Sequence, residues 1–211
     1  MTTTTELAWA FLDEHPSIRD CLRMKVVNYS KLSRLIAGRL GIEKTASQDA
    51  ILIACRRYAE KLRDGGVQEE KILNLLRKSK LETKNKIAVV IVDRRIYLDH
   101  LLDLERKVRA KAELFYAIEG VSAYTLIVAE EYLPEVEKLF LRHMLRRTGG
   151  LALVALRSPT EMESTPGVMA FLAGRLSEHG INVVETMSCW TDTMFVVAEA
   201  DIPKALACLR F

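Results

Sequence analysis

A loop in the last third of the chain combines residue types that could hold a small anion. Ser158-Pro159 opens this loop, and Thr165-Pro166-Gly167-Val168 closes it. Thr165 can cap a helix that starts at Pro166, where the missing N–H costs nothing, and Gly167 leaves the amides of the first turn uncovered. Such amides attract a carboxylate. The pattern therefore predicts a site for a small amino acid.

The elements that must position this loop are well marked. A strand precedes the loop, and a helix with apolar residues at helical spacing follows it and ends at Gly180. A hairpin and a last helix come next. The order is most of a ferredoxin-like βαββαβ unit whose final strand is missing from the sequence. The expected strands are 151–156, 181–189 and 193–199, and the last helix is 202–209.

Residues 151–209 resemble an ACT domain, specifically the regulatory ACT modules at the C-terminal end of aspartokinases. The resemblance is carried by Ser158-Pro159, Thr165-Pro166-Gly167-Val168, Gly180-Ile181-Asn182 and the hairpin Ser188-Cys189-Trp190-Thr191-Asp192-Thr193. It implies allosteric binding of an amino acid or related metabolite, usually at an interface between two ACT units. Carried over residue by residue, it implies ligand-binding roles for Met162, Ser164, Thr165, Gly167, Val168 and Asn182. The alternative is an ordinary helix start in a unit that only pairs subunits.

The middle of the chain repeats the βαββα order without the Ser-Pro and Thr-Pro-Gly motifs. The expected strands are 86–92, 113–118 and 124–129, and the expected helices are 96–109 and 134–146. Residues 85–148 therefore resemble a degenerate ACT-like unit in tandem with the ACT domain at 151–211, with Thr148-Gly149-Gly150 as the junction. Each unit lacks a fourth strand, so the two could lend strands to each other or pair across a dimer. We expect a homodimer or a higher homo-oligomer either way.

Residues 1–80 are predicted to form a helical domain. Its expected helices are 6–12, 17–24 with Ser17 as cap, one capped by Asn28 or Ser30 and closed by Gly41, one opened by a Thr45–Gln48 capping box and ended by Asp64-Gly65-Gly66, and 69–78. Two helices joined by a Gly-containing turn are typical of a helix-turn-helix. Arg56, Arg57 and Lys61 lie off the apolar face of the second, where DNA phosphates could reach them. The alternative is an interaction bundle with a solvated charged face, and residues 80–85 would be a wing or a linker.

Composition and charge limit the classes of protein that fit. The chain has 211 residues, 49% of them hydrophobic, and its apolar runs are too short for a membrane span. Residues 1–84 carry sixteen Lys or Arg against eleven Asp or Glu, whereas residues 151–211 carry four against seven. The four cysteines are scattered and indicate reduced core thiols of a cytoplasmic protein. The histidines are isolated, and nucleotide-binding and hydrolase motifs are absent, so we expect no metal, no cofactor and no catalytic residue.

Together these features predict an α+β protein with a helix-turn-helix-like domain followed by tandem ferredoxin-like ACT-type units. The leading hypothesis is a ligand-responsive transcriptional regulator, in which an amino acid or related metabolite shifts the ACT dimer between two arrangements and the N-terminal helices transmit that shift to DNA. The alternative is a detached allosteric subunit that binds an enzyme of amino-acid metabolism through the same helices. Neither hypothesis makes the chain an enzyme.

Overall fold

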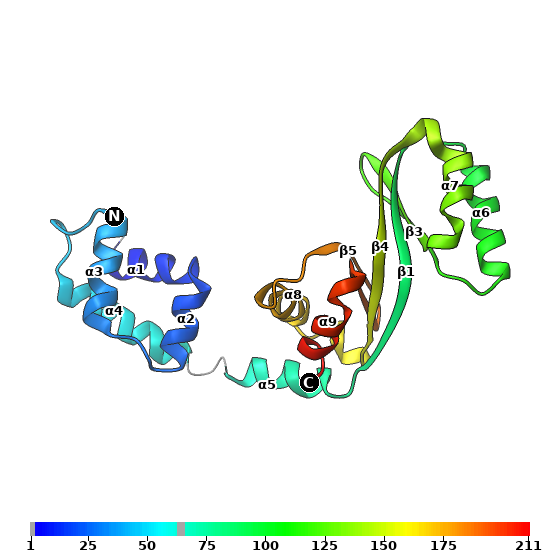
Figure 1. Ribbon diagram of the computed structural model, residues 1–211. Helices are drawn as coiled ribbons and strands as arrows, with labels where there is room; N and C mark the ends of the chain where they lie inside the picture. Colours follow the sequence, from blue (N-terminus) through cyan, green and yellow to red (C-terminus); the bar gives the residue numbers. More distant parts are fainter. Residues whose placement is uncertain (1–2, 63–65) are drawn as a thin grey trace. The chain divides into compact units, whose positions relative to one another are not determined.

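The computed structural model describes residues 3–62 and 66–211 (Figure 1). The chain divides into two compact units, the first ending at Lys71 and the second spanning Ile72–Phe211. Among the described residues, no helix is both long enough and apolar enough to cross a membrane.

The first unit is a helical bundle around an apolar core. Its helices are α1 (Thr4–Asp13), α2 (Pro16–Arg23), α3 (Tyr29–Leu40) and α4 (Gln48–Lys61). Leu12, Ile36 and Ile51 are fully buried between them. Asn28 caps α3 through its side-chain oxygen, and Gly41 ends that helix at a φ of 65°, both as predicted.

Two predicted caps of the first unit are wrong. Ser17 does not cap α2, because the helix already begins at Pro16. Thr45 does not open α4 either, because its hydroxyl turns back to the carbonyl of Ile42 at 3.4 Å. Ser47 is the actual cap and accepts the Ala50 N–H at 3.1 Å. Of the expected terminator after α4, Asp64 and Gly65 lie outside the described residues.

The second unit is built on one antiparallel sheet of six strands in the order β2-β3-β1-β4-β6-β5. The strands are β1 (Lys80–Asp93), β2 (Phe115–Glu119), β3 (Ala123–Ala129), β4 (Met144–Arg157), β5 (Val183–Cys189) and β6 (Asp192–Ala198). The helices are α5 (Gly66–Leu76), α6 (Leu98–Ala110), α7 (Leu133–Phe140), α8 (Val168–Glu178) and α9 (Ile202–Cys208). Helix α5 crosses the boundary between the two units.

Two long strands supply the fourth strands that the sequence seemed to lack. The sheet has a first half, which runs from β1 to α7, and a second half, which runs from β4 to α9. The end of β1 belongs to the first half, whereas its beginning, Lys80–Lys84, pairs with Leu153–Arg157 of the second half. Conversely, the beginning of β4 pairs with Val89–Val92 of the first half. Each half therefore completes the other within one chain, as the antiparallel pair β1–β4 at the centre of the sheet (Figure 1) shows.

This exchange corrects three predictions. Residues 80–85 are neither wing nor linker but the first part of β1. The helix expected at 134–146 ends at Phe140, its last buried apolar residue, and residues 144–148 join the sheet instead. Gly149 and Gly150 lie inside β4, at the place where the two halves meet, and not in a loop between separate domains. At residues 144–148, hydrogen bonding to β1 outweighs local helix propensity, because these residues add the fourth strand of the first half.

The two long strands bend where the halves meet. The β1–β4 register shifts between Lys84 and Ile87, and again between Ile87 and Val89. Lys86 on β1 and Gly150 on β4 both have positive φ, at 53° and 67°. The carboxylate of Glu130 accepts the Gly150 N–H and so holds the irregular stretch of β4. Such bulges bend a strand and increase its twist, which curls the sheet.

Apolar clusters lie on both faces of the sheet. Helices α6 and α7 cover one face of the first half, and α8, α9 and the end of α5 cover one face of the second; in Figure 1 the two groups of helices lie on opposite sides of the long β1–β4 pair. The opposite face has a cluster of its own, in which Leu114 beside β2 and Met187 on β5 are both buried. These residues lie at the two edge strands of the sheet. Because they belong to one buried cluster, the sheet curls so that its two edges approach each other on the helix-free face. Apolar area is thereby removed from water without a covering helix.

The cysteines only partly follow the prediction of core thiols. Cys55 and Cys208 are buried, Cys21 is half-buried and Cys189 is exposed. Burial raises the pKa of the Cys55 thiol to about 11. Cys189 is exposed because it ends β5 at the hairpin, beyond the apolar pattern of that strand.

Candidate functional site

The loop between β4 and α8 is held at its start by Ser158. The Ser158 N–H donates to the carbonyl of Thr191 at 2.8 Å, which ties the loop to the β5–β6 hairpin. The Ser158 side chain is buried, and its hydroxyl accepts a hydrogen bond from the Ser79 hydroxyl at 2.9 Å. Because Ser79 lies just after α5, the loop is fixed to two neighbouring elements at its first residue.

The end of the loop differs from the predicted cap. Helix α8 begins at Val168, and Gly167 is the capping residue at a φ of 89°. Thr165 does not cap the helix, because its hydroxyl donates to the carbonyl of Glu161 at 2.7 Å. The first intrahelical bond runs from the Phe171 N–H to the Gly167 carbonyl at 2.9 Å. The amides of the three residues before Phe171 therefore have no partner inside the helix, as predicted for the first turn.

An open hollow of about 550 Å³ lies at this end of α8. Its walls come from the loop, the first turn of α8 and the β5–β6 hairpin. The lining residues are Met162, Glu163, Thr165, Gly167, Val168, Met169, Ala170, Ser188 and Trp190. The hollow thus brings together four predicted ligand-binding residues: Met162, Thr165, Gly167 and Val168.

The other two predicted residues do not line this hollow. Ser164 is exposed, and its hydroxyl donates to the Glu161 carbonyl at 3.3 Å. Asn182 is exposed beyond the far end of α8, just before β5. Helix α8 has 11 residues, which is about 16 Å at 1.5 Å per residue, so the residues before and after it lie well apart. Strand β5 then runs back, and its late residue Ser188 is the one that reaches the hollow.

Sequence reasoning gave little weight to the hairpin and to Glu163. Ser188 was ranked below Asn182 as a ligand contact, and Trp190 was interpreted as part of a turn, although a strand that follows a helix in this fold returns to the start of that helix. Trp190 has a φ of 51° and is 70% exposed, so its ring lies at the surface beside the hollow. That topological return was the signal that could have placed Ser188 and Trp190 in the site.

A buried hydroxyl supports the floor of the hollow. Thr193 on β6 is fully buried, and its Oγ1 lies 3.5 Å from the Met162 sulfur and 3.8 Å from the Met169 sulfur. One proton can serve either sulfur, so both thioethers are kept near this hydroxyl. On the strand beside it, burial raises the pKa of the Glu185 carboxyl.

Helix α5 packs against the same region from the other side. Its residues Ile72, Leu75 and Leu76 are buried in the apolar cluster that contains Met162 and Val168. A Cβ at Gly167 would lie 3.4 Å from Cδ1 of Ile72. The loop is therefore in direct contact with the helix that leads to the first unit.

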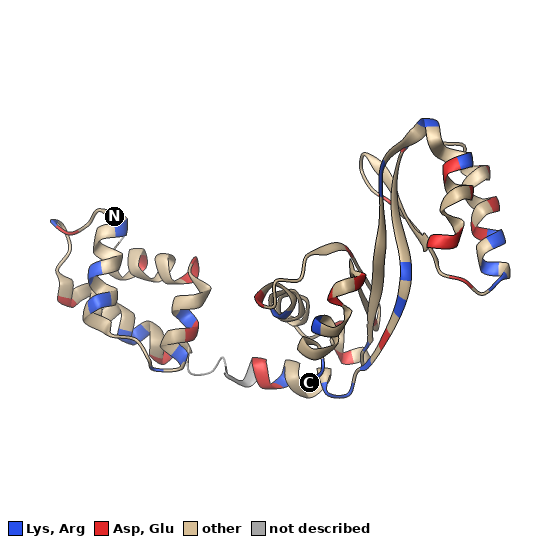
Figure 2. Cartoon of the chain, in the orientation of Figure 1, with Lys and Arg blue, Asp and Glu red and all other residues tan. Residues whose placement is uncertain are grey.

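The predicted DNA-binding residues Arg56, Arg57 and Lys61 are all exposed on α4. Figure 2 shows Lys and Arg on several helices of the first unit. Two of the three predicted residues also contact aromatic rings. The Arg56 guanidinium lies 5.7 Å from the Tyr29 ring centroid, and the Lys61 ammonium lies 5.2 Å from that of Trp9. The charged groups are accessible, and the rings limit the directions in which two of them can point.

The structure offers no cluster for a metal ion in the residues that it describes. No group of three or more His, Cys, Asp or Glu side chains is placed to bind one there.

Comparisons with known proteins agree with the fold of the second unit. The Clostridium acetobutylicum aspartate kinase is 15% identical, with a TM-score of 0.51 over 62% of this chain and 33% of the kinase, so the matched part is a third of that enzyme. The ligand-free regulatory subunit of Thermus thermophilus aspartate kinase is 13% identical, with a TM-score of 0.48 over 61% of this chain and 92% of that one. A Vibrio cholerae protein described as a possible transport protein is 18% identical, with a TM-score of 0.48 over 68% and 95%.

No match was found among curated proteins. Residues 148–210 do match the family model of the ACT domain. This match covers the loop, the hollow and the hairpin described above, and it confirms the resemblance predicted for residues 151–209. The C-terminal part of the chain, residues 148–210, is an ACT domain.

Proposed function

We propose that the chain is a ligand-responsive regulatory protein whose ACT domain binds an amino acid or a related metabolite in the hollow beside α8. The observation that carries the proposal is the coincidence of an ACT family match with a hollow whose rim holds three helix-start amides. Oriented amides at a helix start stabilise a carboxylate. The Glu163 carboxylate on the same rim suits the ammonium group, and Met162 with Val168 offers apolar contact.

The site gains a further anchor if two chains pair. Because the resemblance to ACT modules implies a ligand between two units, the Asn182 and Ser164 of a second copy would complete the predicted set. The edge strands β2 and β5 are free for such pairing within the described part of the chain. The earlier reason for a dimer, a missing fourth strand, no longer holds, so the homodimer now depends on these edges.

A thermal-shift screen of the intact chain against the α-amino acids tests the proposal. Ala170 lines the hollow from an exposed position of α8, so Ala170→Phe should fill the hollow and leave the fold intact. Ala173→Phe is the matched control, because Ala173 is also exposed on α8 but does not line the hollow. We expect the first variant to lose the ligand-induced shift and the second to keep it. If no amino acid binds, or if both variants bind it equally, the site is wrong.

Helix α5 is the natural route for a signal out of the ACT domain. Its Ile72 is buried in one cluster with Val168 at the start of α8, and Ser79 just after it donates a hydrogen bond to Ser158. Ligand contact with the loop would favour one position of α5 over another, and α5 continues into the first unit. A coupling of about 1–3 kcal/mol would suffice for regulation.

We propose DNA as the output partner of the first unit, acting through Arg56, Arg57 and Lys61. Each phosphate contact adds about 1 to the slope of log affinity against log salt, so Arg56→Ala with Arg57→Ala should flatten the slope by up to about 2. The matched control is Arg106→Ala with Arg109→Ala, which removes the same charge from α6 in the second unit. Fluorescence titrations with a generic duplex over a salt series measure both variants.

One observation favours the alternative partner, an enzyme of amino-acid metabolism. Four large apolar side chains of the first unit are 46–69% exposed, namely Met24, Val26, Leu35 and Ile53. Exposed apolar side chains are more useful in a protein interface than on DNA. An unchanged salt slope in the Arg56 and Arg57 variant would therefore move the proposal to a regulatory subunit.

A further inference from the structure

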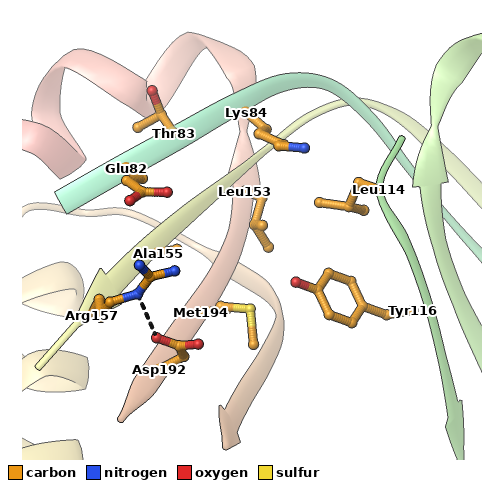
Figure 3. A pocket seen from close by; sticks show the side chains of 10 residues that line it. All are labelled: Glu82, Thr83, Lys84, Leu114, Tyr116, Leu153, Ala155, Arg157, Asp192 and Met194. Carbon is orange, nitrogen blue, oxygen red and sulfur yellow. Dashed lines mark ion pairs between the residues drawn. The ribbon is translucent and has the colours of Figure 1, made fainter. Parts of the chain in front are cut away.

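A second cavity, of about 450 Å³, opens on the helix-free face of the sheet and shares no lining residue with the hollow beside α8. It lies where the two halves of the curled sheet face each other. Its lining residues are Glu82, Thr83, Lys84, Leu114, Tyr116, Leu153, Ala155, Arg157, Asp192 and Met194 (Figure 3). None of the predicted site residues is among them.

Strand register explains the floor of this cavity. Ala155 on β4 is paired with Met194 on β6 and with Glu82 on β1, so these three side chains stand side by side on one face. Leu153, two residues earlier on β4, points the same way. Leu153, Met194 and Leu114 are only 4–6% exposed. The floor is therefore apolar and well packed.

The rim of the cavity is charged and polarised from end to end. Figure 3 shows Glu82, Arg157 and Asp192 on one side and Lys84 with Tyr116 on the other, with Leu153 and Met194 between them. The first end has two carboxylates and one guanidinium, whereas the second has one ammonium and a phenolic hydroxyl. The first end is thus net negative and the second net positive.

Little inside the protein satisfies these charges. The Arg157 Nε lies 3.5 Å from Asp192 Oδ1, and the two side chains are 63% and 43% exposed, so water weakens this pair. Within the described residues, neither Glu82 nor Lys84 has an ion-pair partner within 4.0 Å. Burial, and then the nearby charge of Asp192, raises the pKa of Tyr116, so its hydroxyl remains a proton donor. In Figure 3 that hydroxyl points into the cavity.

We propose that this cavity binds an elongated zwitterion, a molecule with an ammonium and a carboxylate at opposite ends of an apolar chain. The ammonium would lie at Glu82 and Asp192, the carboxylate at Lys84 and the Tyr116 hydroxyl, and the methylene groups on Leu153 and Met194. Asp192 at one end is paired with Arg157, and Lys84 at the other end is paired with Leu153. The two ends are therefore four residues apart along β4, about 13 Å at ~3.3 Å per residue. An α-amino acid has both charges at one carbon and cannot use both ends.

This site is independent of the hollow beside α8, and ligands of defined shape separate the two. Titration calorimetry of the intact chain with ε-aminocaproate should show binding. Caproate lacks the ammonium, hexylamine lacks the carboxylate, and norleucine has both charges at one end of the same carbon chain. Because each loses one charged contact at an exposed rim, we expect affinities about five- to tenfold lower at this cavity. Equal binding of caproate or hexylamine, or no binding of ε-aminocaproate, would overturn the proposal.

Variants assign the binding to this cavity. Lys84→Gln should weaken ε-aminocaproate about five- to tenfold, whereas Lys86→Gln, an exposed lysine of β1 outside the cavity, should leave the affinity unchanged. Ala155→Phe should abolish binding by filling the floor, and Ala170→Phe should not affect it. Binding that survives Ala155→Phe but is lost in Ala170→Phe belongs to the hollow beside α8 and refutes the second site. Loss of α-amino-acid binding alone refutes the proposed function and leaves this one standing.

Discussion

The two halves of the six-stranded sheet share one order of elements but differ in the connection between first strand and first helix. In the first half, four residues separate β1 from α6, and Asp93 accepts hydrogen bonds from both the N–H and the guanidinium of Arg95. In the second half, ten residues separate β4 from α8 and surround a hollow. The halves differ in cover as well, since α5 packs only on the second.

The difference shows that the residues that build the sheet are distinct from the residues that form the candidate site. Both halves need their strands, and each supplies the other's fourth strand. The second half has the longer backbone between strand and helix, and a glycine at positive φ precedes its helix.

The largest expected effect tests the role of α5. Removal of residues 1–80 deletes Ile72, Leu75 and Leu76, which are 2–7% exposed in the core of the second half. Each buried apolar side chain contributes about 1.5–3 kcal/mol, so this truncation should cost about 5 kcal/mol or more. Removal of residues 1–65 keeps all three and should leave the second unit folded. Urea unfolding followed by Trp190 fluorescence compares the two truncated proteins.

Equal stability of the two truncated proteins would contradict the packing of α5. It would also support the domain boundary expected at residue 80, which was placed after the predicted helix 69–78 because residues 80–85 were interpreted as a wing or a linker. The contacts of Ile72 instead assign the end of α5 to the second unit.

The next effect tests whether the halves unfold together. Leu104 in α6 and Leu172 in α8 are at most 1% exposed, in separate clusters of the two halves. Each change to alanine should cost about 2–5 kcal/mol. Because β1 and β4 belong to both halves, either change should lower the protection of both in hydrogen exchange. Protection of residues 151–211 that is unaltered by Leu104→Ala would show two independent halves.

Local sequence patterns predicted most helices and strands but not which strands pair with each other. Gly180 has a φ of 68° and closes α8, as its position after an apolar periodic stretch indicated. The strand at 80–84 was missed because Lys80, Glu82 and Lys84 are polar, although they alternate with Leu81 and Thr83 as a half-exposed strand requires. Their partners lie about seventy residues away, and no local signal specifies them.

The sequence motif predicted which loop residues belong to the candidate site, but it did not predict how the other residues are arranged around it. The loop residues Met162 and Gly167 meet as expected, because they are close in sequence. Asn182 was assigned to the site because the resemblance to ACT modules implies ligand contacts at the start of the second strand, whereas the length of α8 carries that position away from the hollow. The cavity with Lys84 and Arg157 could not be seen, since it depends on the β1–β4 register and on the curl of the sheet.

A smaller effect tests Gly167, the glycine at the end of the loop between β4 and α8. Gly167 has a φ of 89°, so Gly167→Ala should cost about 1–2 kcal/mol and weaken amino-acid binding. Gly174 is the matched control, because a Cβ there meets open space within α8. Gly174→Ala should stabilise the chain by about 0.5–1 kcal/mol, since alanine favours the helix. Thermal unfolding should give opposite signs, and equal signs would refute the role of Gly167.

The smallest effect tests the closed loop of the first half. Hydrogen bonds from the Arg95 side chain, and then from its N–H, lower the pKa of Asp93 to about 2. A lowered folded-state pKa adds stability that is present above the ordinary value near 4 and is lost as the pH falls through about 2. Arg95→Gln should raise the NMR titration midpoint of the Asp93 carboxyl toward 4, whereas Arg106→Gln, which breaks the pair with Asp103, should not. A wild-type midpoint near 4 would contradict the Asp93–Arg95 contact.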